Sequence, residues 1–228
     1  MVTVFAPRSD VLCGSMCQRY SLPDQLAAER EFLPATVWWT FAARFNALPG
    51  QYVPAIRLHA RRTEGVMLHW GLIPARVEGR PAPRPQPSVH SHRIEGSEVY
   101  RMPWLSSQRC ILPVAGFYTW QLTAEGYRQP FFVRLTDRTV FGIAALWDRW
   151  VSDDDDVIES CSVICVPANE LVSDIAGPCG GMPAILRRKQ YHAWLQGTPV
   201  EAKAALQPYK AGWMHAYPVS PQLTSSSA

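Results

Sequence analysis

The sequence predicts a single α+β domain, with a curved, mostly antiparallel β-sheet, a barrel-like core and flanking helices. Three observations support this fold class. The middle of the chain consists of short segments rich in β-branched and aromatic residues, each bounded by turn formers. Helical patterns are fewer, and 20 prolines favour loops and short strands over a helical bundle. A length of 228 residues suits one sizeable domain.

The expected elements follow one another with clear breaks. A helix is predicted from Leu22 to Phe32, and the proline-rich segment "PAPRPQP" at 81–87 is predicted to be an extended surface loop. The acidic segment "SDDDD" at 152–156 separates two apolar runs and indicates a hairpin turn rather than a metal site. The predicted strands are 66–74, 109–121, 130–135, 139–150 and 159–166. The later helices are predicted at Pro167–Ser173, Pro183–Leu195 and Pro199–Leu206.

The chain is expected to divide into three parts: a dispensable extension at 1–15, a domain at 16–220 and a disordered tail at 221–228. The start lacks a basic region followed by a long apolar stretch, so it is not predicted to be a signal peptide. No apolar run reaches the ~18 residues that a membrane span needs. We therefore expect a cytoplasmic monomer without membrane contact, whose six cysteines are reduced thiols.

Cysteine and histidine spacings raise the question of a metal site. Cys161 and Cys165 share one face of a predicted strand, which favours buried thiols over zinc ligands. His90 and His92 share one face of an extended segment and could bind a metal, but no third ligand is evident beside them. We therefore predict no metal and no cofactor.

Nucleotide and hydrolase motifs are absent, because there is no G-x-S-x-G and "GPCGGMP" lacks the lysine of a phosphate-binding loop. Arginines alternate with aromatic residues in "QRY" (18–20), "ARFN" (43–46) and "YRMPW" (100–104). This pattern is typical of grooves that bind phosphates and stack bases. The alternative is that the arginines only pack over surface tryptophans. The mild net charge of +3 does not decide between them.

The segment "MCQRYSLP" (16–23) resembles the start of the SRAP family (SOS response-associated peptidases, the abasic site processing proteins), whose chains open Met-Cys-Gly-Arg-Phe/Tyr. Later segments resemble further family blocks in the same order, so the likeness extends from Met16 to about Ser220. These segments are "ARFNALPGQYVPAIR", "HWGLIPA", "HSHRIEG", "RCILPVAGFYTWQ", "QPFFV", "FGIAALWDRW", "SVICVPANELVSDI" and "PVS".

The resemblance implies a role in the DNA damage response, through covalent capture of abasic sites in single-stranded DNA. Once Met16 is lost, Cys17 carries both a free α-amine and a thiol. The amine condenses with the aldehyde of the opened sugar, and the thiol then closes a thiazolidine ring. An internal cysteine has no amine, so the favoured interpretation is that the functional chain starts at Met16. Proteolysis after Met16 is the alternative route.

The chain departs from the family at the expected catalytic positions. The family's asparagine corresponds to Ser91, its glutamate to Thr119, and its histidine to Cys179 or Ala176. A threonine hydroxyl can donate a hydrogen bond but cannot shuttle protons near neutral pH. His90 or His92 could replace the missing histidine. The resemblance implies DNA binding through retained residues, namely Arg19, Arg44, Asn46, Trp70, Arg93 and Glu95.

Three functions remain open from the sequence. The first is a slow crosslinker that keeps DNA binding and belongs, by resemblance, with lyases or hydrolases. The second is a degenerate relative that binds single-stranded DNA without a covalent bond. The third is peptidase-like activity, including self-cleavage that exposes Cys17.

Overall fold

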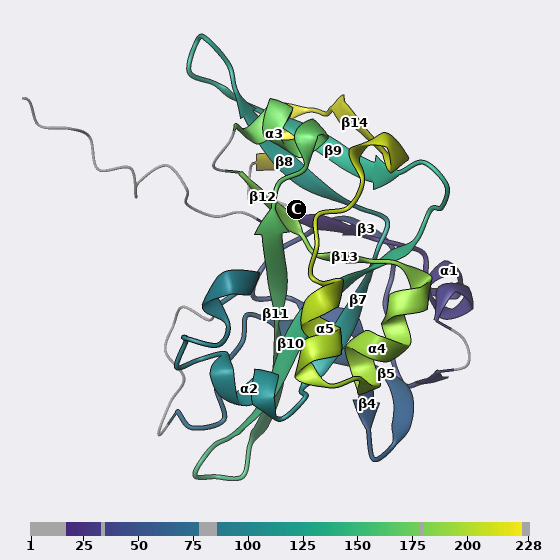
Figure 1. Cartoon of the computed structure of the whole chain (residues 1–228), viewed down its shortest axis with the longest axis vertical. Helices are drawn as coiled ribbons and strands as arrows, with labels where there is room; N and C mark the ends of the chain where they lie inside the picture. The colour runs from purple at the N-terminus through teal and green to yellow at the C-terminus, as the bar shows by residue number, and fades with distance from the viewer. Residues whose placement is uncertain (1–16, 33–34, 78–85, 178–179, 225–228) are drawn as a thin grey trace, which may run out of the picture.

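The computed structural model describes residues 17–32, 35–77, 86–177 and 180–224 (Figure 1). The expected extension at 1–15, most of the proline-rich segment and Cys179 lie outside these residues. The strands are β1 (Tyr20–Leu22), β2 (Thr36–Val37), β3 (Arg44–Ala47), β4 (Tyr52–His59), β5 (Arg62–Trp70), β6 (Ser88–His90), β7 (Arg109–Val114), β8 (Gly116–Leu122), β9 (Arg128–Leu135), β10 (Phe141–Val151), β11 (Val157–Pro167), β12 (Gly181–Pro183), β13 (Ile185–Leu186) and β14 (Met214–Pro218). The α-helices are α1 (Gln25–Glu31), α2 (Arg101–Leu105), α3 (Glu170–Ala176), α4 (Tyr191–Gln196) and α5 (Pro199–Ala205), and the 3-10 helices are η2 (Ser91–Arg93), η3 (Arg188–Gln190), η4 (Ala211–Trp213) and η5 (Pro221–Thr224).

The larger of the two sheets closes on itself. Its strands pair in the order β11, β10, β7, β4 and β5, and β5 then pairs with β11 through Ser160↔His69 and Cys161↔Trp70. This last pairing is parallel, as are those of β2 with β5 and β6 with β11, while the other pairings are antiparallel. Closure leaves no free edge between these five strands. The predicted α+β class with a barrel-like antiparallel core is therefore confirmed.

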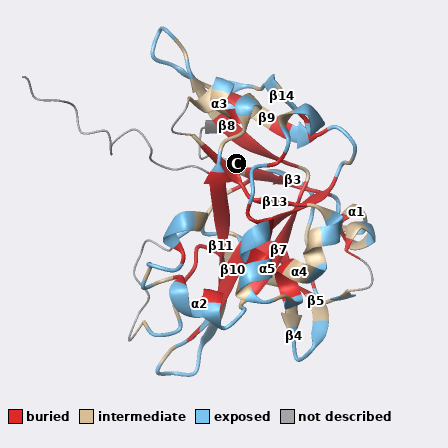
Figure 2. Cartoon of the chain, in the orientation of Figure 1, coloured by how far each residue is buried: buried red, intermediate tan, exposed pale blue. Residues whose placement is uncertain are grey.

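Two long strands form the centre of the core. Every residue of β10 from Phe141 to Asp148 is buried, as is every residue of β11 from Ser160 to Val166 (Figure 2). The two strands pair up to Val151↔Val157, so the acidic segment forms the turn of this hairpin, as predicted. Cys161 and Cys165 are both buried thiols on β11.

The smaller sheet has the order β14-β9-β8-β1-β3 and presents two different faces. Tyr20, Phe117 and Val133 are cross-strand partners on β1, β8 and β9, and all three are buried. Tyr118 and Phe132, the next pair, point to the opposite side, because successive side chains of a strand alternate between faces. Helix α3 packs against β8. This sheet therefore has one face against the core and one face outward.

The helices show which helix boundaries the sequence pattern predicted correctly. Helix α5 begins after Thr198, whose hydroxyl and backbone form a capping box with Glu201, and this confirms the predicted helix. Helix α1 begins three residues later than Leu22, because Asp24 caps it by accepting from Ala27 N and Leu22 belongs to β1. Similarly, α3 begins at Glu170 rather than Pro167, because Asn169 caps it by accepting from Val172 N.

The helix predicted at Pro183–Leu195 is wrong over its first part. Residues 181–186 are all buried and form β12, which pairs with β11, and β13, which pairs with β10. A run of buried apolar residues with partners on two core strands is stabilised as strand, whatever its helix propensity. Helical structure begins only at η3 and α4. Among the residues that the structure describes, no helix is long and apolar enough to cross a membrane.

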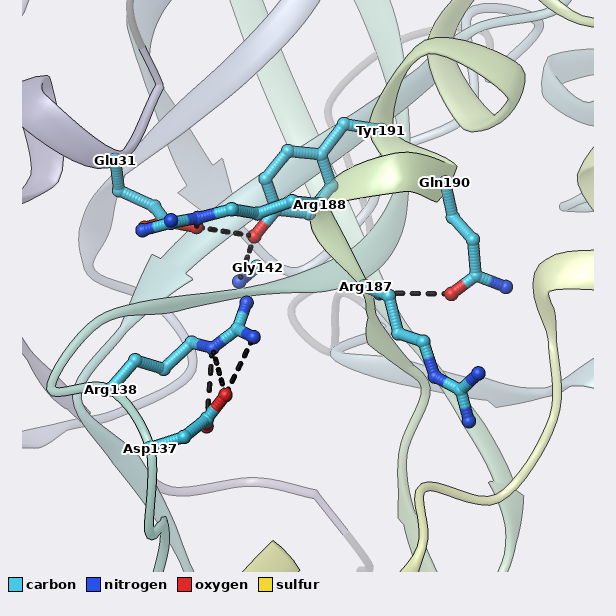
Figure 3. Close-up of polar contacts among 8 residues, drawn as sticks. All are labelled: Glu31, Asp137, Arg138, Gly142, Arg187, Arg188, Gln190 and Tyr191. Carbon is cyan, nitrogen blue, oxygen red and sulfur yellow. Dashed lines mark hydrogen bonds and ion pairs between the residues drawn. The ribbon is translucent and has the colours of Figure 1, made fainter.

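A polar cluster fastens α1 to the barrel (Figure 3). The Glu31 side chain is only 4% exposed, and its carboxylate accepts hydrogen bonds from Arg188 Nε and Nη2. It also accepts a hydrogen bond from the Tyr191 hydroxyl at 3.1 Å, and that oxygen accepts from Gly142 N of β10 at 3.1 Å. Burial raises the pKa of Tyr191 far above its ordinary value, so it remains a donor. The cluster ties segments from both ends of the chain to one core strand.

Candidate functional site

Cys17, the predicted nucleophile, lies in the core at the beginning of the described chain. It is 7% exposed, and its thiol forms a hydrogen bond with the thiol of Cys165. Burial, and secondly Cys165, raises the pKa of the Cys17 thiol well above its ordinary value, so the thiol is protonated at neutral pH. Its φ of +63° lies in the left-handed region, which costs an L-residue roughly 1–2 kcal/mol.

Cys165 connects Cys17 to the other family positions. In the pair β6–β11 its register partner is His90, the residue before Ser91. In the pair β11–β12 its partner is Pro183. Ser91 and the segment that precedes β12 therefore approach the same part of β11 as Cys17. That preceding segment contains the family's histidine position, of which Cys179 lies outside the described residues and Ala176 ends α3.

Thr119 approaches from the smaller sheet. It is 8% exposed, lies on the core-facing side of β8 and pairs with Phe131. Its neighbour Tyr118 donates its backbone N–H to the Arg19 carbonyl at 3.1 Å. Because β1 and β8 are antiparallel, Thr119 lies beside the chain that leads from Arg19 back to Cys17. Cys17 therefore lies where the two sheets meet.

A pocket of about 550 Å³ opens next to β6, with His90, Arg93 and Tyr100 in its lining. Burial, and then the neighbouring His92 and Arg93, lowers the pKa of His90, so its ring is neutral at pH 7 and can accept a proton. Tyr100 donates to the Ser88 carbonyl at 3.3 Å, and its burial raises the pKa of the hydroxyl to about 12. The pocket can hold a polar ligand next to a cation and a neutral base.

Arg44 and Asn46 line a second, wider groove of about 930 Å³ together with two exposed rings. Phe45 is 81% exposed and Tyr52 is 54% exposed. The Asn46 side-chain oxygen accepts from Arg19 Nη1 at 3.0 Å, which links the groove to the strand that follows Cys17. Exposed rings next to guanidinium groups suit a single-stranded nucleic acid, whose bases stack and whose phosphates are anionic.

Two residues predicted to contact DNA have other partners. Trp70 has no exposed surface, donates its indole N–H to the Pro87 carbonyl at 2.8 Å and packs on Tyr20 with ring centroids 4.5 Å apart. A ring without exposed surface cannot stack on a base, so this structure assigns Trp70 to the core and corrects the prediction. Glu95 is exposed and forms an ion pair with Lys203 at 2.9 Å, and its negative charge does not suit a phosphate contact.

The end of the chain also reaches this region. Arg19 donates a hydrogen bond to the Leu223 carbonyl, and η5 packs against β9. The tail was expected to be disordered from residue 221, but Pro221–Thr224 forms η5, and only residues 225–228 lie outside the description. Favourable contacts with β9 and Arg19 stabilise this turn, which its polar sequence alone does not predict.

Sequence reasoning missed Cys165 as a neighbour of Cys17. It predicted a buried thiol on a core strand, and the strand and burial are both observed. The contact joins Cys17, which precedes β1, to a strand of the other sheet, and the periodicity within one strand carries no information about such a pair.

Comparison with known proteins identifies a family that this chain matches. The sequence model of SRAP, the SOS response associated peptidase family, matches residues 16–226. The abasic site processing protein YoqW of Bacillus subtilis is 26% identical over 226 residues, which cover 98% of this chain and 92% of the relative. The abasic site processing protein HMCES of Mus musculus is 24% identical over 82% of this chain and 63% of the relative.

Solved structures show the same fold. A protein from Bacteroides thetaiotaomicron superposes with a TM-score of 0.80 at 22% identity, over 90% of this chain and 93% of that one. A protein from Bordetella bronchiseptica gives a TM-score of 0.79 at 23% identity, over 90% of this chain and 100% of that one. At these identities the likeness concerns the fold alone.

Proposed function

The chain belongs to the SRAP family, and on that premise we propose that it processes abasic sites in DNA. Relatives that bear the name abasic site processing protein support this activity. We further propose that Cys17 captures the lesion in single-stranded DNA as a covalent thiazolidine. The observation that carries this proposal is the family's opening motif, Met16-Cys17 followed by Arg19. Cys17 also lies close to the strand that bears Thr119 and to the strand that leads to Ser91.

The proposed chemistry uses both nucleophiles of one residue. The α-amine attacks the sugar aldehyde, forms a C–N bond and releases water as the imine develops. The sulfur then adds to the imine carbon, and the thiol proton is transferred to nitrogen, which closes the five-membered ring. An α-amine has an ordinary pKa near 8, so about a tenth of it is neutral at pH 7. The reaction needs no oxidant, metal or other co-reactant.

Removal of Met16 is required, and the backbone at Cys17 favours it. A φ angle exists only when a residue precedes, and that of Cys17 is in the unfavourable left-handed region. Loss of Met16 abolishes this torsion and frees the amine in the same step. Removal by a methionine-specific aminopeptidase from a chain that starts at Met16, or cleavage of a longer chain, gives the same product.

The residues around Cys17 suit a slow reaction. Thr119 can orient a hydroxyl or water by hydrogen bonding, but it supplies no proton transfer near neutral pH. Acid–base groups of this kind typically contribute 10²–10⁴ in rate. The two nucleophiles share one carbon frame, so ring closure retains a high effective concentration without such groups. We therefore propose a crosslinker that is slow but retains DNA binding through Arg19, Arg44, Asn46 and Arg93.

The test compares three proteins on a single-stranded oligonucleotide with one abasic site. These are the full chain, a chain that starts at Met16, and the Met16 start with Cys17→Ala. We expect a band that survives denaturing electrophoresis for the Met16 start and none for Cys17→Ala. Cys17→Ser is the matched control, because it keeps the amine and yields an imine that is trapped only by borohydride. Intact mass of the full chain reports whether it is cleaved to Cys17.

A second function, binding of DNA without a covalent bond, is favoured by the buried, protonated thiol and the absent acid–base residues. In that case the Met16 start binds the oligonucleotide in a native gel and leaves no band after denaturation. The covalent proposal is then rejected, and the binding proposal stands.

A further inference from the structure

The outward face of the smaller sheet carries a row of aromatic side chains. Tyr118 on β8 pairs with Phe132 on β9, which pairs with Tyr217 on β14. Cross-strand partners share one face, so the three rings cross the sheet side by side. Ring centroids are 5.1 Å apart between Tyr118 and Phe132 and 5.7 Å apart between Phe132 and Tyr217. His215 continues the row, 5.8 Å from Tyr217.

These rings lie across the sheet rather than standing away from it. A Cβ at Gly116 would come within 2.3 Å of the Phe132 ring, so this glycine leaves the space that the ring occupies. The Tyr118 hydroxyl donates to the Phe45 carbonyl of β3 at 2.6 Å, so its ring extends over β1. Tyr118 is buried and forms the base of the row, Phe132 is half-buried, and Tyr217 is 39% exposed. The accessible ring surface therefore lies over β9 and β14.

The same face is positively charged. Strands β8, β9 and β14 contain no aspartate or glutamate, and Arg134 and His215 are exposed cross-strand partners beside the rings. The nearest acidic residues along the chain, Glu125 and Asp137, lie beyond the ends of β9, and Asp137 is paired with Arg138 at 2.8 Å. An anionic ligand with planar groups is complementary to this face.

Further cations lie near Trp213, the residue before β14. The Trp213 ring is 46% exposed and lies between two cations. The guanidinium of Arg187 and the ammonium of Lys210 are each 5.5 Å from its centroid. Rings held beside cations are suited to phosphates and bases together.

The strand that carries the inner end of the row also borders the proposed site. The backbone N–H of Tyr118 donates to the carbonyl of Arg19, two residues after Cys17, while the Tyr118 ring lies on the opposite face of the sheet from Thr119. We propose that this face, formed by Phe132, Arg134, His215 and Tyr217, binds the single-stranded DNA on one side of the lesion. This rests on the proposed function, since it extends the DNA path away from Cys17. Bases stack on the accessible rings, and Arg134 and His215 contact the phosphates.

The experiment uses the full chain and fluorescent oligonucleotides that carry a tetrahydrofuran abasic analogue, which has no aldehyde and forms no adduct. One probe extends about ten nucleotides on the 5′ side of the analogue and the other about ten on the 3′ side, within the range of known single-strand sites. Phe132→Ala and Tyr217→Ala should both weaken the binding of the same one of the two probes, each by about 5- to 10-fold. The affinity for the other probe should stay unchanged. Tyr127→Ala is the matched control, because Tyr127 is a 73% exposed ring in the β8–β9 hairpin outside the row.

Two further readouts keep the test decisive. Arg134→Gln changes only an exposed charge and should reduce the salt dependence of binding by roughly 0.7 in log–log slope for that same probe. Unchanged affinity for both probes, or equal loss for both, overturns the proposal, because one face can serve only one side of the lesion. Adduct formation on a short abasic oligonucleotide is measured separately, so failure of the covalent proposal is distinguishable from failure of this one.

Discussion

The two sheets use similar strands for opposite purposes. In the larger sheet, β10 and β11 are buried over continuous runs, and the buried Asp148 and Ser160 side chains accept hydrogen bonds from backbone N–H groups of residues 73 and 75. In the smaller sheet, β8, β9 and β14 bury one face and leave rings and cations on the other. Acidic residues gather at the far end of the larger sheet, in the turn at 152–156, while β8, β9 and β14 have none (Figure 1).

This difference predicts which substitutions should change stability and which should change DNA binding. Cys17 precedes β1 of the smaller sheet, yet its thiol contacts Cys165 of the larger one. The proposed nucleophile is held by the barrel on one side and by the smaller sheet on the other, and the aromatic row lies on the outer face of that sheet. Changes in the barrel should therefore alter unfolding, and changes in the open sheet should alter DNA binding.

The largest effect is expected from Arg57→Ala in the barrel. The Arg57 guanidinium is 2.8 Å from both Glu64 and Glu159 and lies 4.3 Å above the Trp147 ring. Removal leaves two carboxylates without their cation, which should lower the free energy of unfolding by about 3 kcal/mol. Urea denaturation measures this loss.

Two further variants test whether the missing charge of Arg57 causes the loss of stability. Arg57→Met keeps the aliphatic stem and should lose nearly as much stability, because the missing charge is responsible. Arg76→Ala breaks the exposed pair with Glu98 and should change stability by less than about 0.5 kcal/mol. Equal losses for Arg57→Ala and Arg76→Ala would contradict the rigid role assigned to the barrel.

A smaller effect is expected from Gly116→Ala in the open sheet. The added methyl would overlap the Phe132 ring and the Val133 carbonyl, so stability should fall by about 1–3 kcal/mol and the aromatic row should be displaced. DNA binding should therefore weaken even at temperatures where the variant is folded. Gly212→Ala, which has open space around the new methyl, is the control and should change neither property.

The sequence predicted the parts of this comparison that depend on local patterns. The strands around β7–β11, the acidic hairpin turn and α5 follow from alternation, turn formers and capping residues. The segment from Gly181 to Leu186 was misread as helix, because its strand state depends on partners in β10 and β11. The contact of Cys17 with Cys165, the burial of Trp70 and the fold of the tail on Arg19 likewise arise from packing between distant segments.

The pH profile of adduct formation tests the junction between the sheets. Burial and Cys165 raise the pKa of the Cys17 thiol, so the reactive thiolate is a minor species and its fraction grows with pH. The adduct that survives without borohydride should form faster as the pH rises from about 6 to 8, because the neutral α-amine and the thiolate both become more abundant. Cys165→Ala should shift the profile slightly to lower pH, because burial, the larger cause, remains. The imine that Cys17→Ser forms, trapped with borohydride, reports the amine alone, and an identical pH profile for the Cys17 protein would contradict a protonated thiol.

The smallest effect concerns the C-terminal segment, which places a backbone carbonyl where the open sheet meets the site. Arg19 donates to Leu223 and to Asn46, so DNA that binds Arg19 must compete with η5 for one of its hydrogen-bonding positions. Ending the chain after Ser220 should therefore tighten binding of undamaged single-stranded DNA by about threefold, the size of one modest net hydrogen bond. Fluorescence anisotropy of the shortened and full chains measures this difference.

In an Arg19→Gln background the same truncation should have no effect, since the neutral amide no longer attracts phosphate. If truncation tightens binding equally in both backgrounds, the tail acts by covering the sheet face as a whole, and its specific contact with Arg19 is not the cause.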